Sequence, residues 1–183
     1  MKRSLLFFVL LLPLLYLLIS VQSANDPIKY IFTCTGISSL IILILSLSLT
    51  PLKKIINLIK YRRMMGLFSF FYALLHFLNF YILDAQFDVT FVLKETLDKP
   101  FIYLGMIAFS ILLFMAITST RKLFAKFNKW HKLVYIVLIL VVIHEAMAQK
   151  VLGNLEFMFI FMTIVLLGYR AFLFRVKWLK KKK

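Results

Sequence analysis

Six long apolar stretches alternate with short polar ones along this 183-residue chain. Each stretch has about 20 residues, the length that an α-helix needs to cross the hydrocarbon core of a bilayer. The apolar residues are continuous and do not alternate one by one, which indicates helices and not the strands of a membrane barrel. The pattern predicts an all-α, polytopic membrane bundle of six transmembrane helices, at about residues 5–21, 30–49, 65–83, 101–118, 130–148 and 155–174.

The composition indicates one domain. The chain is 63% hydrophobic and only 16% charged, and its polar stretches are too short to bury a core of their own. We therefore expect a single transmembrane domain over residues 1–183, with its functional core at about residues 30–150. The single cysteine, Cys34, has no partner within the chain and is expected to pack inside its helix.

The first apolar stretch has two interpretations. Met1-Lys2-Arg3 followed by apolar residues is typical of a signal peptide, and Val21-Gln22-Ser23-Ala24 is an indifferent cleavage signal. The length of the stretch favours a retained first helix, which Pro13 could kink.

The charges predict the orientation of the bundle. Alternate loops and both termini hold 19 of the 23 Lys and Arg residues, and only Lys29, Lys94, Lys99 and Lys150 lie on the opposite side. By the positive-inside rule the basic side is cytoplasmic, which places both termini in the cytoplasm. The net charge of +16 thus indicates topology, with no nucleic-acid partner, and the lysines at 180–183 are expected to meet anionic membrane lipid.

Three histidines carry the candidate chemistry. His76 and His144 lie deep inside apolar stretches, where an ionisable ring is costly and usually functional. Each follows the basic end of its helix, Arg63 or His131, by 13 residues, or about 20 Å along the axis. Both helices run outward in the predicted topology, so the two rings match in depth. They are expected to bind one haem iron from opposite sides, as ligands do in helical bundles.

Small residues support this interpretation of the third helix. Gly66, Ser69 and Ala73 fall on the same helical face as His76 and would leave room for a flat macrocycle. The alternative role of these small residues is close packing of helices. For the histidine, the alternative is that it only forms a hydrogen bond to a neighbouring helix. A similar stripe that starts at Gly105 is interpreted as packing alone.

His131 is a less certain cofactor-binding residue. It lies between Trp130 and Lys132 at the membrane interface, where an aromatic ring is stable without a ligand. No fourth histidine exists, so a second bis-histidine haem cannot be built within one chain. The arginines on this side, Arg62, Arg63 and Arg121, are either lipid anchors or clamps for a haem propionate or a flavin phosphate.

Several of these stretches in combination resemble the MsrQ family, within the ferric-reductase-like transmembrane proteins. The resemblance covers about residues 25–170, and it is carried by the sequences at 26–30, 35–36, 49–52, 62–76, 99–106, 116–121 and 130–144. It implies that His76 and His144 bind haem b, and that His131 is the third family histidine.

The resemblance further implies a role in electron transfer in the bacterial inner membrane. Electrons would come from the quinone pool, and FMN would be a further cofactor. The acceptor would be a periplasmic molybdopterin enzyme, MsrP, which carries the catalytic site for methionine sulfoxide on its own chain. The acidic outer loop, Asp84 to Asp98, is either a docking surface for this partner or a solvated loop.

Two other functions remain open from the sequence. One is a different ferric-reductase-like cytochrome b, whose flavin and nicotinamide domain would be a separate protein. The other is a cofactor-free transporter or structural subunit, in which the histidines only bridge helices.

Overall fold

The computed structural model describes residues 3–55 and 57–181, and every regular element within them is helical. The main helices are α1 (Arg3–Ser20), α2 (Pro27–Ser48), α3 (Arg62–Leu78), α4 (Val89–Asp98), α5 (Pro100–Ile117), α6 (Arg121–Phe127), α7 (Val134–Ala148) and α8 (Asn154–Lys181). Six segments of the described chain are long and apolar enough to span a membrane: Arg3–Ser23, Pro27–Ser48, Ile59–Asp84, Pro100–Ile117, Trp130–Ala148 and Asn154–Val176. The predicted six-helix membrane bundle is confirmed. Lys182 and Lys183, the end of the predicted lipid-binding lysines, lie outside the described residues.

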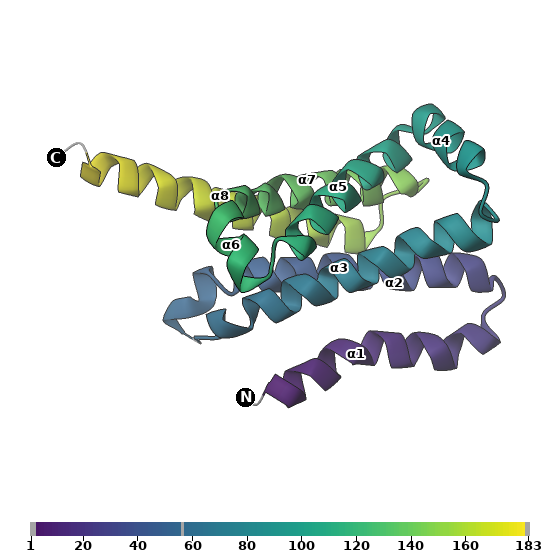
Figure 1. Cartoon of the computed structure of the whole chain (residues 1–183), viewed down its shortest axis with the longest axis horizontal. Helices are drawn as coiled ribbons and strands as arrows, with labels where there is room; N and C mark the ends of the chain where they lie inside the picture. Colours follow the sequence, from purple (N-terminus) through teal and green to yellow (C-terminus); the bar gives the residue numbers. More distant parts are fainter. Residues whose placement is uncertain (1–2, 56, 182–183) are drawn as a thin grey trace.

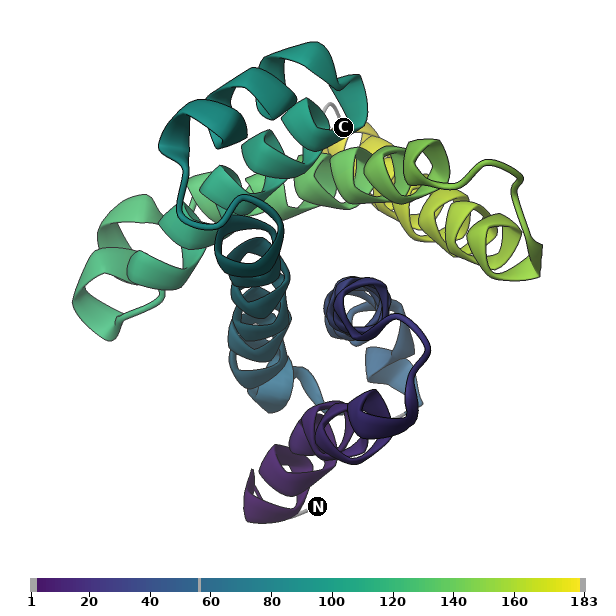
Figure 2. The ribbon, with the colours of Figure 1, turned by 90° about the vertical axis from the view of Figure 1, so that its right-hand side faces the viewer.

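The spanning helices run alternately in opposite directions (Figure 1). As a result α1 begins and α8 ends toward the same side, and α3 and α7 run in the same direction. The helices form layers, with α1 on one outer face, α2 and α3 in the middle, and α5, α7 and α8 on the other face (Figure 2). Within this arrangement α3 packs chiefly against α2, and α7 packs chiefly against α5. The two long histidine-bearing helices therefore belong to two different helix pairs.

A tyrosine fastens α1 to this bundle. Pro13 lies inside α1, and the buried Tyr72 of α3 inserts its hydroxyl beside it. That hydroxyl donates to the Leu10 carbonyl at 2.8 Å and accepts from the Leu14 N–H at 3.1 Å. Leu10 and Leu14 would pair with each other in a regular helix, so the tyrosine bridges a hydrogen bond that the proline region has opened.

Two serines join α2 to α3. Ser39 Oγ donates to the Ser69 carbonyl at 2.9 Å, and Ser69 Oγ donates to the Ser39 carbonyl at 3.0 Å. Both serines are buried, with Ser69 fully enclosed. Small residues let the two backbones approach, and the reciprocal hydrogen bonds fix how the helices sit against each other.

The loop expected after the third spanning helix is largely helical. The last turns of that span, Asn79–Asp84, form a π-helix, and two left-handed residues follow, Gln86 at φ 47° and Phe87 at φ 66°. Asp88 then caps the N-terminus of α4, and its carboxylate accepts the backbone N–H groups of Thr90 and Phe91. These hydrogen bonds, the one from Phe91 above all, lower the pKa of Asp88. The hydrophobic pattern did not predict this short exposed helix.

Candidate functional site

His76 and His144 meet between the two helix pairs. His76 projects from α3 and His144 from α7, and their ring centroids lie 6.1 Å apart with the ring planes at 90°. Both side chains are partly buried. The structure thus brings together the two histidines that their depth in the membrane had singled out.

His76 is held by α2. Its Nδ1 lies 3.1 Å from the carbonyl oxygen of Phe32, and the Phe32 ring contacts it edge to face at 5.3 Å between centroids. The Thr35 hydroxyl is also near, at 3.5 Å, but it donates to the Ile31 carbonyl at 2.6 Å. The close polar partner of His76 is therefore a main-chain carbonyl.

His144 is held by α5 in the same manner. Its Nδ1 lies 2.6 Å from the carbonyl oxygen of Phe101, and the two rings are 5.9 Å apart between centroids. A phenylalanine thus supplies both the carbonyl and a ring contact to each histidine, once from α2 and once from α5.

These contacts determine which nitrogen carries the proton. A carbonyl oxygen can only accept, so Nδ1 must donate in His76 and in His144. In the neutral ring Nε2 then keeps its lone pair, and among the described residues it has no hydrogen-bond partner in either histidine. A metal-binding histidine usually has this arrangement, with its second nitrogen hydrogen-bonded to a carbonyl or carboxylate.

The spacing of the rings also suits one metal ion. Imidazole nitrogens bind such ions at about 2.0–2.1 Å, which puts the centroids of two rings on opposite sides of one ion about 6 Å apart. The observed 6.1 Å agrees with this value. Among the described residues no group of three or more His, Cys, Asp or Glu could hold a metal ion by itself. A pair of axial ligands therefore suits a metal whose remaining ligands come with a macrocycle.

Of the three small residues of α3, Ser69 and Ala73 have the alternative role, helix packing, whereas Gly66 has open space beside it. Ser69 is fully buried against α2, and Ala73 packs onto the apolar core. They serve helix packing, because the His76 face of α3 turns toward α2. The stripe on α5 was likewise interpreted too simply: Ala108 and Leu112 are buried in the core, whereas Gly105 abuts the ring of His144.

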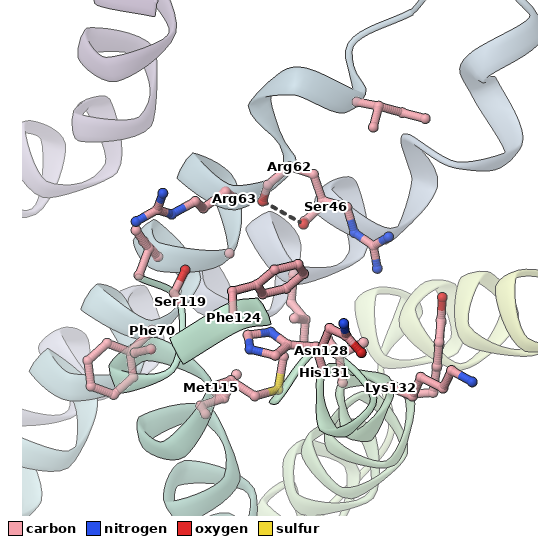
Figure 3. Close-up of a pocket in the computed structure, with 18 of the residues that line it drawn as sticks. Ser46, Arg62, Arg63, Phe70, Met115, Ser119, Phe124, Asn128, His131 and Lys132 are labelled. Atoms are coloured by element: carbon pink, nitrogen blue, oxygen red, sulfur yellow. Dashed lines mark hydrogen bonds between the residues drawn. The ribbon is translucent and has the colours of Figure 1, made fainter. Parts of the chain in front are cut away.

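His131 lies at the other end of the span that carries His144. It lines a cavity of about 850 Å³ between α2, α3, α5, α6, α7 and α8. Its Nε2 lies 3.1 Å from the Thr118 hydroxyl, which already donates to the Phe114 carbonyl at 2.7 Å. Nε2 therefore donates to Thr118, which leaves Nδ1 with the lone pair. The Phe124 ring packs on the imidazole at 4.8 Å, and Figure 3 shows both beside Met115.

The cavity is strongly basic. Of the described residues that line it five are cationic and none is acidic; the cations are Arg62, Arg63, Arg121, Lys132 and Arg170. Arg170 was not expected at a site, because only the fold brings α8 beside the Tyr135 ring and Thr50. A planar anionic group with carboxylates or phosphate suits such a lining.

The geometry defines a class of protein: a polytopic helical membrane protein with one histidine pair inside the bundle and a basic cavity at one end. Residues 6–142 match the family model of the ferric reductase like transmembrane component. The protein-methionine-sulfoxide reductase heme-binding subunit MsrQ of Herminiimonas arsenicoxydans is 38% identical, over 99% of this chain and 87% of its own length. The proteins of that name from Pectobacterium carotovorum and Agrobacterium fabrum are 36% and 37% identical, over 91% and 86% of this chain and 89% and 76% of their own lengths.

The chain therefore belongs to the ferric-reductase-like transmembrane family and, within it, to the MsrQ family. No solved structure matches it significantly.

Proposed function

We propose that this chain is the haem b electron-transfer subunit of a protein-methionine-sulfoxide reductase system, and that His76 and His144 would hold the haem. The observation that carries the proposal is the histidine pair, whose Nδ1 atoms are both committed to main-chain carbonyls at a ring spacing of 6.1 Å. The names of the similar MsrQ proteins, which call them heme-binding subunits, support it.

Haem would supply the one-electron chemistry of the transfer. His76 and His144 would hold the haem, and two histidine ligands from the protein suit electron transfer. The carbonyls of Phe32 and Phe101 orient the rings and would make them stronger electron donors to the haem iron. The surrounding apolar helices keep water away from the site.

We assign the basic cavity to a second cofactor, with FMN as the candidate. The five cations could bind its phosphate, and Phe124 and Tyr135 offer aromatic walls. His131 is the cofactor-binding histidine of this cavity, and its Nδ1 is the nitrogen available to a ligand.

We assign the direction of transfer from the charge distribution. The basic side, with the cavity and both termini, is taken as cytoplasmic, and the His76–His144 pair then lies in the outer half of the bacterial inner membrane. The whole chain would act as one transmembrane domain. Quinol would donate the electrons. The acceptor would be a periplasmic MsrP-like molybdopterin enzyme, which carries the catalytic site for methionine sulfoxide on its own chain.

The test is a spectrum followed by two additions. The detergent-purified protein, expressed with haem supplied, should show low-spin haem b bands in a reduced-minus-oxidised difference spectrum. Added quinol should reduce the haem, and an MsrP-like reductase with methionine sulfoxide should reoxidise it. A colourless protein would indicate a cofactor-free transporter or structural subunit, in which the histidines only bridge helices. A haem that a nicotinamide-dependent flavin reductase reduces but that never passes electrons to the MsrP-like enzyme would indicate another ferric-reductase-like cytochrome b.

A further inference from the structure

Two glycines lie directly behind the paired histidines. A Cβ atom built on Gly36 of α2 would come within 3.2 Å of Cε1 and Nδ1 of His76. A Cβ atom on Gly105 of α5 would come within 2.9 Å of Cε1 and 3.0 Å of Nδ1 of His144. The 2.9 Å contact at Gly105 would force the His144 ring to shift, and the 3.2 Å contacts at Gly36 would require the His76 ring to move by a few tenths of an ångström.

Each glycine lies one helical turn after the carbonyl that its histidine uses. Phe32 precedes Gly36 by four residues, and Phe101 precedes Gly105 by four residues. In an α-helix the β-substituent of a residue lies beside the carbonyl four positions earlier, which is why Ser and Thr hydroxyls often bond to it. Thr35 does so here, with its hydroxyl 2.6 Å from the Ile31 carbonyl. At the two glycines, an imidazole from another helix occupies that position.

We propose that Gly36 and Gly105 are positioning residues, which expose the Phe32 and Phe101 carbonyls to His76 and His144 and so fix each ring and its proton on Nδ1. The consequence for the redox potential rests on the proposed function, whereas the position of the proton does not. The arrangement occurs twice, on two helices far apart in the sequence, and each glycine serves one histidine.

The chain offers a matched control. A Cβ on Gly168 of α8 would meet nothing within 4 Å. Alanine in place of glycine ordinarily stabilises a helix. Helix propensity alone would therefore change the stability in the same direction at Gly36, Gly105 and Gly168. A loss at Gly36 and Gly105 that is absent at Gly168 isolates the contact with the histidine.

The experiment compares G36A, G105A and G168A with the wild type by NMR of ¹⁵N-histidine-labelled, haem-free protein in detergent. The chain has only three histidines, and H76Q, H131Q and H144Q assign their signals. His76 and His144 should show a protonated Nδ1 in the wild type and in G168A. G105A should move the His144 proton or ring signals, and G36A should move those of His76 less, because its contact is longer.

The haem-loaded protein gives a second, separate measurement. The midpoint potential should rise in G105A, because a histidine that has lost its carbonyl partner is a weaker donor to ferric iron. It should rise less in G36A and stay constant in G168A. Unchanged histidine signals in G105A and G36A would overturn the proposal, as would equal changes in G168A. A wild type that takes up no haem would contradict the proposed function alone, and the spectra of the haem-free protein would still decide the role of the glycines. If G105A does not fold, G36A with its milder contact decides the outcome.

Discussion

The two ends of the fifth spanning segment, Trp130–Ala148, present a histidine in two different ways. At one end His144 meets His76, each with a main-chain carbonyl and a glycine behind it, and within residues 3–55 and 57–181 no charged side chain makes a hydrogen bond to either ring. At the other end His131 lies in an open cavity that five cations line, with a threonine hydroxyl as its hydrogen-bond partner.

The difference separates two ways to hold a group inside a membrane. The histidine pair defines a site by ligand geometry, since buried neutral groups fix the rings without the cost of burying charge. The cavity defines a site by charge, since its arginines suit carboxylate or phosphate groups and its single histidine can occupy only one axial position. Changes at one end should therefore leave the other end largely intact.

The largest effect is expected at the paired histidines. H76A and H144A each remove one axial ligand, and should lower haem affinity by more than the roughly 10- to 100-fold that the loss of an outer-shell partner costs. The measurement is the reduced-minus-oxidised spectrum of the purified protein with its haem-to-protein ratio. H131A is the control and should retain the bands of the histidine pair. Full haem occupancy in H76A would show that the ligands lie elsewhere.

A second effect should be confined to the cavity. Replacing Arg63 by Gln removes one cation from the lining, and H131A removes the imidazole. Flavin binding should weaken by about 10-fold in R63Q, which loses a charge-assisted hydrogen bond at about 1.5 kcal/mol, and it should also weaken in H131A, which loses the ring and its Nδ1 acceptor. The measurement is flavin fluorescence after denaturation, with K126Q as a control in α6 that does not line the cavity. Flavin loss equal in K126Q and R63Q would indicate a general charge effect and contradict the assignment of the cavity.

A smaller effect is expected where α1 meets α3. Y72F removes the hydroxyl that bridges Leu10 and Leu14, and leaves both main-chain groups unpaired in an apolar setting. The free energy of unfolding should fall by about 1–3 kcal/mol, as measured in detergent, with the haem spectrum unchanged. Y103F, at a half-exposed position, is the control and should cost little. A shifted haem spectrum in Y72F would mean that the histidine pair is not independent of α1.

The smallest effect is expected at the serine pair. S39A and S69A should each lower the free energy of unfolding by about 0.6 kcal/mol, the average for such hydrogen bonds between membrane helices. Ser110 donates only within its own helix, so S110A is the matched control. The double variant S39A/S69A measures how far the two hydrogen bonds are coupled, and single losses no larger than that of S110A would contradict their role.

The sequence alone determined the six spans, the side on which the cations gather, and the depth of His76 and His144. These features follow from local composition, because a bilayer imposes one length and one polarity on every crossing segment. Even the match in depth needed only the rise per residue of a helix. The six spans of the structure and the transmembrane family that the chain matches confirm the predicted spans.

Only the tertiary structure decided what surrounds each histidine. The carbonyls of Phe32 and Phe101 lie 44 and 43 positions away from the rings that use them, and Arg170 reaches the cavity from the last helix. A helix carbonyl is already paired within its own helix, so no sequence pattern marks it as an acceptor for another side chain. Gly105 was interpreted as a packing residue, and Gly36 had no predicted role of its own, until the neighbouring helix was placed beside each of them. The sequence of each helix determines where the spans lie, whereas the packing of the helices against one another determines which groups contact each histidine.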